Sequence, residues 1–459
     1  MRLIVLFEDH TLQGFRPVSW SVPVYEIPCG LFNLRERVAT VAGEAGRDDR
    51  LVLLPRTLLS DLQAASLPDG MACGIEAAQA VAVRAEAVLF LNARLGPDWA
   101  VLRDLITRVP PFALRDEEGL LAAAVAPGQA KTLLADWQAW EAAQAAAGAW
   151  TAPNRAAEPW LPALDAKSGG VPAWRHLWDL VPDLGRALAE DTAAVIAAGL
   201  EIRRSPFGVF PEAASPPLWR AGSRLRPYEA APGVALVGAD RIWAAEDVEV
   251  GPTAVIDARH GPVVLDRGVT VLPHCYLEGP LYLGAGVRVK AGAALYGETA
   301  VGAACRVAGE VAETQMLPLS NKQHAGFLGH AVIASWVNLG ADTTCSDLKN
   351  NYGEIQVNYG LGPVPTGSRF VGLMMAEHAK SAIGTTFNTG TTVGFASNVF
   401  GAGFPRSCLA NFTWGDGRGR RAFDVEKAIE VATIVMQRRG CRFTPAHDAL
   451  FRALSVGSA

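Results

Sequence analysis

Residues 235–410 carry a repeat with a period of six residues. Neither an α-helix, with a period of about 3.6, nor a single β-strand, with a period of about two, produces this spacing. A coil of three short strands does, because each strand then points one aliphatic side chain inward. We therefore predict a left-handed parallel β-helix of hexapeptide repeats; ordinary strands that happen to lie six residues apart are the alternative. The positions in unbroken register are Leu265, Val271, Leu277, Leu283, Val289, Leu295, Val301 and Val307.

The same period recurs on both sides of this run. Coils of a solenoid bury their side chains against neighbouring coils, so each end of the repeat needs a cap. We expect an α/β domain in front of the repeat to supply the N-terminal cap. The further positions that share the spacing are Val250 and Ile256 in a shifted phase, then Phe327, Ile333 and Leu339, and then Phe387, Val393 and Val399.

The first 200 residues lack this repeat and alternate between strand-like and helix-like segments. Short apolar runs at 2–7, 50–54 and 87–91 predict strands, whereas the stretches 129–148 and 183–200 predict helices. Strands that alternate with helices are typical of a layered α/β sheet. We therefore expect an α/β domain of the Rossmann-like, nucleotidyltransferase type in front of the β-helix.

The segment after the repeats predicts one helix, at 425–439 (VEKAIEVATIVMQRR). Asp424 is a suitable N-cap, arginines occupy the last turn, and Gly440 follows as a stop signal. We expect this helix to pack on the last coils or on a neighbouring subunit. The predicted domains are the α/β domain at 1–200, a linker at 201–234, the β-helix at 235–410, and the C-terminal helix and tail at 411–459.

Composition excludes several classes of function. The net charge of −5 and the pI near 6.0 give no basic surface for nucleic acid. No apolar run approaches the length of a membrane span, and the start, MRLIVLFEDH, is too short for a signal peptide. The seven cysteines are scattered, without a CxxC pair, which favours reduced thiols and a cytoplasmic protein.

Several longer stretches carry a resemblance to a known family. In the repeat region these are SNKQHAGFLGH, SWVNLGADTTCSDLKNNYGEI and FNTGTTVGFASNVFGAGFPR, and in the first half PVSWSVPVYEIPCGLFNLRERV, VLFLNARLGPD and WDLVPDL. The chain resembles the bifunctional glucosamine-1-phosphate acetyltransferase / N-acetylglucosamine-1-phosphate uridylyltransferase family, and most closely a divergent sugar nucleotidyltransferase branch. The resemblance covers most of the chain and is strongest at 235–410.

The resemblance implies an acetyl-CoA-dependent acetyltransferase site in the β-helix. His324, five residues before Gly329, takes the position of the general base. A histidine has suitable basicity to remove a proton from an amino sugar before the amine attacks a thioester. Asn338 matches an asparagine of the same site, and the backbone of Ala341 matches the donor that stabilises the oxyanion. The further residues with expected substrate or acetyl-CoA contacts are Lys290, at the position that binds sugar phosphate, and Lys322, Lys349 and Asn350 nearby.

The repeat region also departs from the family. The second basic residue ahead of the histidine is lost, and GEVAET offers Glu310 and Glu313 instead. Ser346-Asp347 replaces Asn-Tyr after Cys345, so the acceptor can differ from glucosamine-1-phosphate. The simpler alternative for His324 is a loop histidine between coils. For His330, whose position is an aspartate in the better-known enzymes, a packing role is the preferred interpretation. His378 and Lys380, in an inserted segment, are further candidates for the same groove.

The first half lacks the glycine-rich phosphate loop that a nucleotidyltransferase usually carries after its first strand. Arg16 and Arg35 are candidates to bind nucleotide phosphate in its place. Arg94, in LNARLGPD, stands where the resemblance puts a metal-binding aspartate and is a third candidate. Asp9 and Asp179 are the acids that could hold Mg²⁺, and each is equally explained as a cap or loop carboxylate.

These observations lead to a first hypothesis and several alternatives. The first is a sugar-nucleotide transferase: the β-helix acetylates an amino sugar 1-phosphate, and the α/β domain transfers a nucleotidyl group from an NTP with Mg²⁺. The resemblance implies a homotrimer that binds sugar phosphate and nucleotide, without nucleic acid or membrane partners. The alternatives are a nucleotidyltransferase only, and a scaffold that keeps both folds without chemistry. A metal-dependent hydrolyase of the β-helix type is a further alternative, and it requires three histidines on one zinc.

Overall fold

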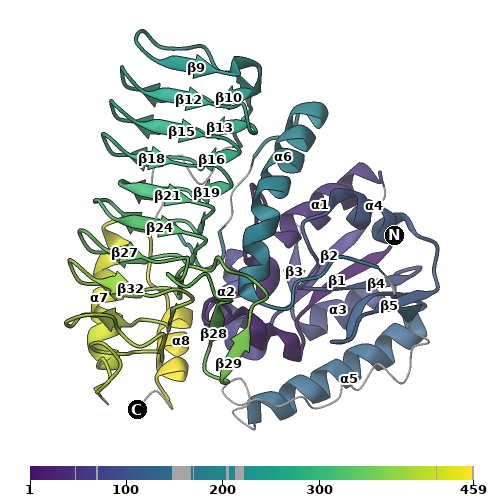
Figure 1. Ribbon diagram of the computed structural model, residues 1–459. Coiled ribbons are helices and arrows are strands. Elements are labelled where there is room, and N and C mark those ends of the chain that lie inside the picture. Colours follow the sequence, from purple (N-terminus) through teal and green to yellow (C-terminus); the bar gives the residue numbers. More distant parts are fainter. Residues whose placement is uncertain are drawn as a thin grey trace. The chain divides into compact units, whose positions relative to one another are not determined.

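The computed structural model describes residues 1–46, 48–68, 71–146, 167–168, 170–202, 206–211, 222–419 and 421–456 (Figure 1). The chain divides into two compact units. The first contains Met1–Ile27 and Phe32–Leu177, and the second contains Pro28–Leu31 and Trp178–Ala459. The division falls before the helix at 183–200, which the sequence assigned to the first domain, so this helix belongs to the β-helix unit.

The first unit is built on one mixed β-sheet. Strand β1 (Leu3–Phe7) lies at its centre and pairs in parallel with β2 (Arg50–Leu54) and β4 (Val88–Asn92). All side chains of β1 are buried, as expected for a central parallel strand with helices on both faces. In spatial order the strands are β3 (Ala72–Cys73), β2, β1, β4, β6 (Leu120–Val125), β5 (Phe112–Arg115) and β7 (Lys167–Ser168).

Helices cover the sheet of the first unit on both sides (Figure 1). Leu3, Val5 and Phe7 alternate along β1 and pack in one cluster with side chains of α3 and α5, because alternate residues of a strand face the same side. On the other side α1 packs with α4. The predicted α/β domain is confirmed. Its helices are α1 (Leu34–Glu44), α2 (Thr57–Ser66), α3 (Ile75–Ala82), α4 (Trp99–Thr107) and α5 (Pro127–Ala146), with 3₁₀ turns η1 (His10–Phe15), η2 (Val18–Trp20) and η3 (Val24–Glu26).

The second unit is a left-handed parallel β-helix, as the repeat predicts. Figure 1 shows its short strands stacked as the rungs of a ladder. The strands form faces A, B and C, which the chain visits in the order B, C, A in each coil. Face A runs through β8 (Arg226–Pro227), β10 (Ile242–Ala244), β13 (Val263–Leu265), β16 (Leu281–Leu283), β19 (Thr299–Val301), β22 (Gln315–Met316), β25 (Val332–Ile333), β30 (Met374–Met375), β33 (Thr392–Val393) and β35 (Cys408–Leu409).

Faces B and C complete each coil. Within a face, neighbouring strands pair in parallel, as in Val271 opposite Val289, except that β8 pairs antiparallel with β10 at the start of face A. Face B contains β11 (Glu249–Val250), β14 (Thr270–Val271), β17 (Arg288–Val289), β20 (Arg306–Val307), β23 (Asn321–Lys322), β26 (Asn338–Leu339), β31 (Lys380–Ser381) and β34 (Asn398–Val399). Face C contains β9 (Ala235–Val237), β12 (Val255–Asp257), β15 (Tyr276–Glu278), β18 (Ala294–Leu295), β21 (Glu310–Ala312) and β24 (Phe327–Gly329), followed by the pair β27 (Thr344–Cys345) and β32 (Thr386–Phe387).

The aliphatic residues of the unbroken six-residue register are all buried in the core of the solenoid, which confirms their inward orientation. The prediction was wrong for Phe327, because Leu328 is the core residue of β24 and pairs with Val311. The phase shifts here because the coils shorten: Asn321 lies opposite Asn338, a step of 17 residues, whereas Val271 and Val289 are 18 apart. Position-by-position extrapolation of the period therefore fails after the shortened coils.

The solenoid is interrupted once its chain leaves β27. Residues 346–371 form an excursion that contains the antiparallel hairpin β28 (Gln356–Asn358) and β29 (Pro363–Pro365). Its base is closed by the backbone, where the Val371 N–H donates to the Asp347 carbonyl at 3.0 Å. His378 and Lys380, expected in an inserted segment, instead belong to the regular coil that follows.

Helices α6 (Leu180–Ala198), α7 (Val425–Gln437) and α8 (Pro445–Ser455) belong to the second unit. The predicted helix at 425–439 is confirmed as α7, with Asp424 accepting the Lys427 N–H as its N-cap. The sequence analysis missed α8 within the predicted tail. Both α7 and α8 lie beside the later coils (Figure 1), and Met436 of α7 packs with Leu319 and Trp336. In the described ranges no helix is both long and apolar enough to cross a membrane.

Candidate functional site

His324 lies on a turn at the corner where face B passes into face C. The turn, residues 323–326, links β23 to β24 and contains Gly326, whose φ is 108°. Hydrogen bonds join this part of the chain to the coils before and after it. The Glu310 N–H donates to the Gly326 carbonyl at 3.3 Å, and the Phe327 N–H donates to Thr344 Oγ1 at 3.0 Å. The imidazole of His324 is exposed, so a substrate can reach it.

Lys322 occupies an inward position directly before this turn. It lies opposite Val307 on one side and Leu339 on the other, where the rest of the column is largely aliphatic. Its Nζ donates to the backbone carbonyls of Ala308 at 2.9 Å and of His324 at 3.0 Å. Burial lowers the pKa of the Lys322 ammonium to about 8, although acidic neighbours oppose the shift. The lysine thus fixes the backbone of the His324 turn from inside the solenoid.

The fold brings some of the other residues that the resemblance placed at this site close to the His324 turn. Asn338, on β26, is exposed one coil after Asn321, whose Nδ2 lies 3.4 Å from the Asn338 Oδ1. Ala341 lies on the next turn of the same corner, which adjoins the His324 turn. Lys290 directly follows β17, two coils before Lys322 along face B.

The two remaining candidates leave the corner. Lys349 and Asn350 lie in the excursion after β27, where the Lys349 Nζ donates to the Glu354 carbonyl at 2.7 Å and Asn350 is exposed. The corner therefore collects the proposed base, its neighbouring asparagine and the proposed oxyanion donor. The two excursion residues belong to a separate segment of the solenoid wall.

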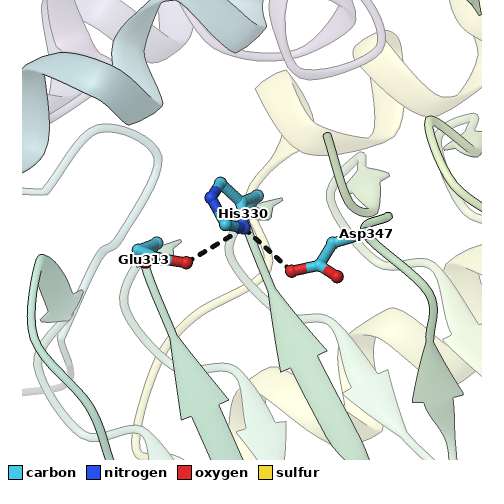
Figure 2. Close-up of side chains that lie close together, drawn as sticks. All are labelled: Glu313, His330 and Asp347. Atoms are coloured by element: carbon cyan, nitrogen blue, oxygen red, sulfur yellow. Dashed lines mark hydrogen bonds and ion pairs between the residues drawn. The ribbon is translucent and has the colours of Figure 1, made fainter. Parts of the chain in front are cut away.

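A second group of ionisable side chains meets at the next corner, where face C passes into face A. His330 Nδ1 lies 2.8 Å from Asp347 Oδ2 and 3.0 Å from Glu313 Oε2. One ligand atom from each of the three residues lies within 4.8 Å of the others, a geometry that could hold a metal ion. Figure 2 shows the imidazole between the two carboxylates, with the three side chains contributed by successive coils.

The surroundings of this acid–histidine cluster, Glu313, His330 and Asp347, explain its electrostatics. Burial favours the neutral imidazole, but hydrogen bonds to Asp347 and Glu313 outweigh it and raise the pKa of His330 to about 9. Glu298 occupies the same corner one coil earlier, and burial, with the charge of Glu313, raises the pKa of its carboxyl group. The ring of Phe370 stacks on His330 with centroids 5.0 Å apart.

The sequence analysis assigned a packing role to His330 and did not group it with Glu313 and Asp347. A usable signal was present: the three residues are spaced by 17, and 17 is the length of a coil in this region. In a solenoid, residues one coil apart are neighbours, so this spacing alone predicts that they meet. The six-residue period was followed in aliphatic residues only, so the spacing of these three ionisable residues was overlooked.

In the first unit, two of the three arginines expected to bind nucleotide form internal ion pairs. Arg35 Nε lies 2.7 Å from Glu26 Oε1, with both side chains buried. Arg94 forms a two-pronged pair with Asp116, at 2.6 and 2.5 Å, and this pair lowers the pKa of Asp116 against the opposing effect of burial. These pairs tie the arginines to strands and helices of the unit itself.

The remaining expected nucleotide and metal residues have these positions. Arg16 is buried, with its guanidinium 4.1 Å from the centre of the Trp20 ring. Asp9 caps η1: its Oδ1 accepts the Thr11 N–H at 2.9 Å and its Oδ2 lies 2.5 Å from Asn92 Nδ2. Asp179 belongs to the second unit, where it precedes α6. The two acids expected at a Mg²⁺ site are therefore contributed by different units.

Comparisons with known proteins found a family model, a curated relative and a solved structure that resemble parts of this chain. Residues 4–198 match the model of a family described as sugar nucleotidyl transferase. A stretch of 91 residues, 20% of this chain, is 29% identical to a bifunctional sugar-1-phosphate nucleotidylyltransferase/acetyltransferase from Sulfurisphaera tokodaii, and this stretch spans 23% of that protein's length. Among solved structures, the chain is similar to AntD, an N-acyltransferase from Bacillus cereus in complex with dTDP and 3-hydroxybutyryl-CoA, with 14% identity and a TM-score of 0.20. That alignment covers 45% of this chain and 92% of the other.

Proposed function

We propose that this chain is a transferase of sugar-nucleotide biosynthesis. Its β-helix transfers an acetyl group from acetyl-CoA to an amino sugar 1-phosphate, and its first unit transfers a nucleotidyl group from an NTP to a sugar 1-phosphate. The observation that carries the acetyl-transfer step is the His324 turn, which carries an exposed imidazole and adjoins the turn of Ala341. The match of residues 4–198 to sugar nucleotidyl transferases supports the class of substrate.

In the proposed acetyl transfer, His324 accepts a proton from the amino group of the sugar. The freed amine attacks the thioester carbon of acetyl-CoA, and a C–N bond forms. The backbone N–H of Ala341 stabilises the oxyanion of the tetrahedral intermediate, and the C–S bond then breaks to release the thiolate of CoA. The attacking nitrogen loses its second proton to solvent as the amide forms. The proton held by His324 passes to the thiolate, which leaves the histidine neutral for the next cycle.

Lys322 and Asn338 have supporting parts in this proposal. Lys322 holds the carbonyl of His324 through a hydrogen bond of 3.0 Å and so restrains the turn that carries the base. Asn338 presents an exposed amide on the adjoining strand and can bind the acetyl donor or the sugar. Lys290 carries the positive charge for the sugar phosphate. We further propose that the enzyme works as a cytoplasmic homotrimer, the arrangement that the resemblance implies.

The proposed nucleotidyl transfer is the second activity, and the described residues of the first unit near the expected Mg²⁺ site do not fit a bound ion. The Asp9 carboxylate already accepts hydrogen bonds from Thr11 and Asn92. Arg94 brings a positive charge to the position where the resemblance expects an aspartate, and Asp116 is engaged by that arginine. No step of the nucleotidyl transfer is therefore assigned to a metal ion in this chain.

The acetyl-transfer proposal is tested by the release of free thiol from acetyl-CoA with glucosamine-1-phosphate and other amino sugar phosphates as acceptors. The variant is His324→Ala. The matched control is His274→Ala, because His274 is an exposed histidine on the same corner, three coils earlier. We expect acceptor-dependent release that falls by at least about a hundredfold in His324→Ala, the usual contribution of a general base, and stays unchanged in the control.

Equal thiol release by His324→Ala and the wild type would exclude His324 as the base. A parallel assay of pyrophosphate release from each NTP, with sugar 1-phosphates, tests the first unit. Activity in this assay alone would favour the nucleotidyltransferase without acetyl transfer. Inactivity in both assays would favour a scaffold, the candidate that the internal pairing of Arg35 and Arg94 supports.

The hydrolyase alternative requires three histidines at one metal ion. In the described part of the chain, the one group of side chains with metal-ligand geometry contains a single histidine, His330. His324 lies on the other side of β24, at a different corner. The alternative is therefore not proposed.

A further inference from the structure

We propose that Glu313, His330 and Asp347 form a binding site for a divalent transition-metal ion. The proposal goes beyond the acetyl and nucleotidyl transfers, because it uses a corner of the β-helix that His324 does not occupy. The three side chains come from successive coils and converge on one point (Figure 2). Of Zn²⁺, Mn²⁺ and Co²⁺, we expect Zn²⁺ to bind most tightly.

The distances from His330 Nδ1 to the two carboxylate oxygens are close to those between ligand atoms around such an ion. Ligand nitrogen and oxygen atoms lie about 2.1 Å from Zn²⁺. Two ligands at right angles around the ion are then about 3.0 Å apart, and two at tetrahedral angles are about 3.4 Å apart. His330 Nδ1 lies 2.8 and 3.0 Å from the two carboxylate oxygens, so small outward shifts would admit the ion.

A single N–H of the imidazole cannot pair fully with both carboxylate oxygens, whereas a cation can bind all three ligand atoms at once. An imidazole nitrogen carries at most one proton, and an ionised carboxylate only accepts hydrogen bonds. Nδ1 of His330 can therefore direct its single N–H at Asp347 or at Glu313, or divide it between them, while both oxygens lie within hydrogen-bond distance. A divalent ion accepts a lone pair from all three atoms and neutralises both carboxylates.

The site is accessible and its shape is maintained by neighbouring residues. The side chains of His330 and Asp347 are 19% and 15% exposed, and that of Glu313 is 39% exposed, so an ion can enter and retain water ligands. Phe370 stacks on the imidazole and fixes its plane. A Cβ at Gly329 would lie 2.5 Å from Asp347 Oδ2, so the glycine provides the space in which this carboxylate approaches His330.

The ligand set decides which ions fit. One imidazole and two carboxylates suit Zn²⁺, Mn²⁺ or Co²⁺, whereas Mg²⁺ and Ca²⁺ prefer shells made entirely of oxygen. Among divalent ions of the first transition row, nitrogen-containing sites generally bind Zn²⁺ more tightly than Mn²⁺ or Co²⁺. Co²⁺ is a convenient probe, because its visible absorption reports the coordination geometry and reveals bound thiolates.

The test uses the full chain, freed of metal by a chelator, and titrates it with Zn²⁺ by calorimetry and with Co²⁺ by absorption. The ligand variants are His330→Asn, Glu313→Gln and Asp347→Asn. Asparagine suits position 330, whose φ is 46°, because it tolerates the left-handed region. Gly329→Ala removes no ligand atom but displaces Asp347. The controls are His274→Ala, which removes an exposed histidine, and Glu310→Gln, which removes an exposed carboxylate on β21.

We expect one Zn²⁺ per chain, and a Co²⁺ spectrum without a thiolate charge-transfer band. Each ligand variant and Gly329→Ala should weaken binding by more than about tenfold, since even residues around metal ligands have effects of this size. The controls should bind as the wild type does. Absence of binding in the wild type, a thiolate band, or equal affinities in the ligand variants and the controls would overturn the proposal. Circular dichroism of each variant confirms that the β-helix is folded.

Discussion

Replacement of Lys322 by methionine tests whether a charged group inside the solenoid destabilises the protein. Lys322 replaces an aliphatic residue in the inward column between Val307 and Leu339 and is 2% exposed. Methionine has a similar length without the charge and is flexible enough to fill the same space. The substitution removes the ammonium group together with its hydrogen bonds to two backbone carbonyls.

The effect of Lys322 on the free energy of unfolding follows from the pKa of its ammonium group. Burial lowers it from 10.5 to about 8, and this gap corresponds to about 3 kcal/mol at 1.36 kcal/mol per pKa unit. Between these two values the unfolded chain binds more protons than the folded chain, so the free energy of unfolding increases with pH. The cost of the buried charge is fully present below the folded pKa of about 8, and it disappears as the pH rises past 10.5.

The assay is urea unfolding of the wild type and Lys322→Met, followed by circular dichroism across this pH window. Relative to the variant, the wild type should gain about 2 kcal/mol in the free energy of unfolding between about pH 7 and about pH 9.5. Lys290→Met, which also removes one lysine near this corner, serves as the control for net charge. A difference between wild type and Lys322→Met that stays constant with pH would refute the argument.

Further predictions concern capping, a buried histidine and a buried ion pair. Asp424→Ala should lower the free energy of unfolding by about 1 kcal/mol, because α7 loses the cap that accepts the Lys427 N–H; chemical denaturation measures it. Burial lowers the pKa of His378 well below 6.5, so the wild type should lose stability as the pH falls below 6.5, and His378→Phe should lose less; thermal unfolding at several pH values compares them. Arg94→Met should cost about 3 kcal/mol by removing the charged partner of Asp116, and the double variant Arg94→Met/Asp116→Asn, which keeps the oxygen that accepts the Glu118 and Gly119 N–H groups, should recover part of that loss in urea unfolding.

The β-helix could be predicted from the sequence because its core repeats one simple requirement in every coil. Each strand must bury one side chain, so the aliphatic positions from Leu265 to Val307 keep an unbroken register. The same argument failed at Phe327, where a shortened coil changes the phase. Coil length depends on how the corners turn, and six-residue spacing does not encode it.

The sites were harder to predict because they depend on which residues face each other across coils. His324 was selected by resemblance, and the structure adds that its turn adjoins that of Ala341. Lys322 was expected to add charge to the substrate site, yet its side chain points into the core. The partners of Arg35 and Arg94 lie 9 and 22 residues away and come from different elements, so no local pattern identifies them.

The excursion at 346–371 can change in length without a change in the coils of the solenoid. Its ends meet at a closed base, where Val371 bonds to Asp347 and Gly372 bonds to His330, so the coils on either side stack as though the segment were absent. Doubling the length of such a loop costs only about 0.6 kcal/mol in closure entropy. Insertions at its exposed turns, such as the one at Asn351 and Tyr352, can therefore accumulate without disturbing the solenoid. Relatives of this protein can differ widely in that segment and still keep the same acids and histidine at its base.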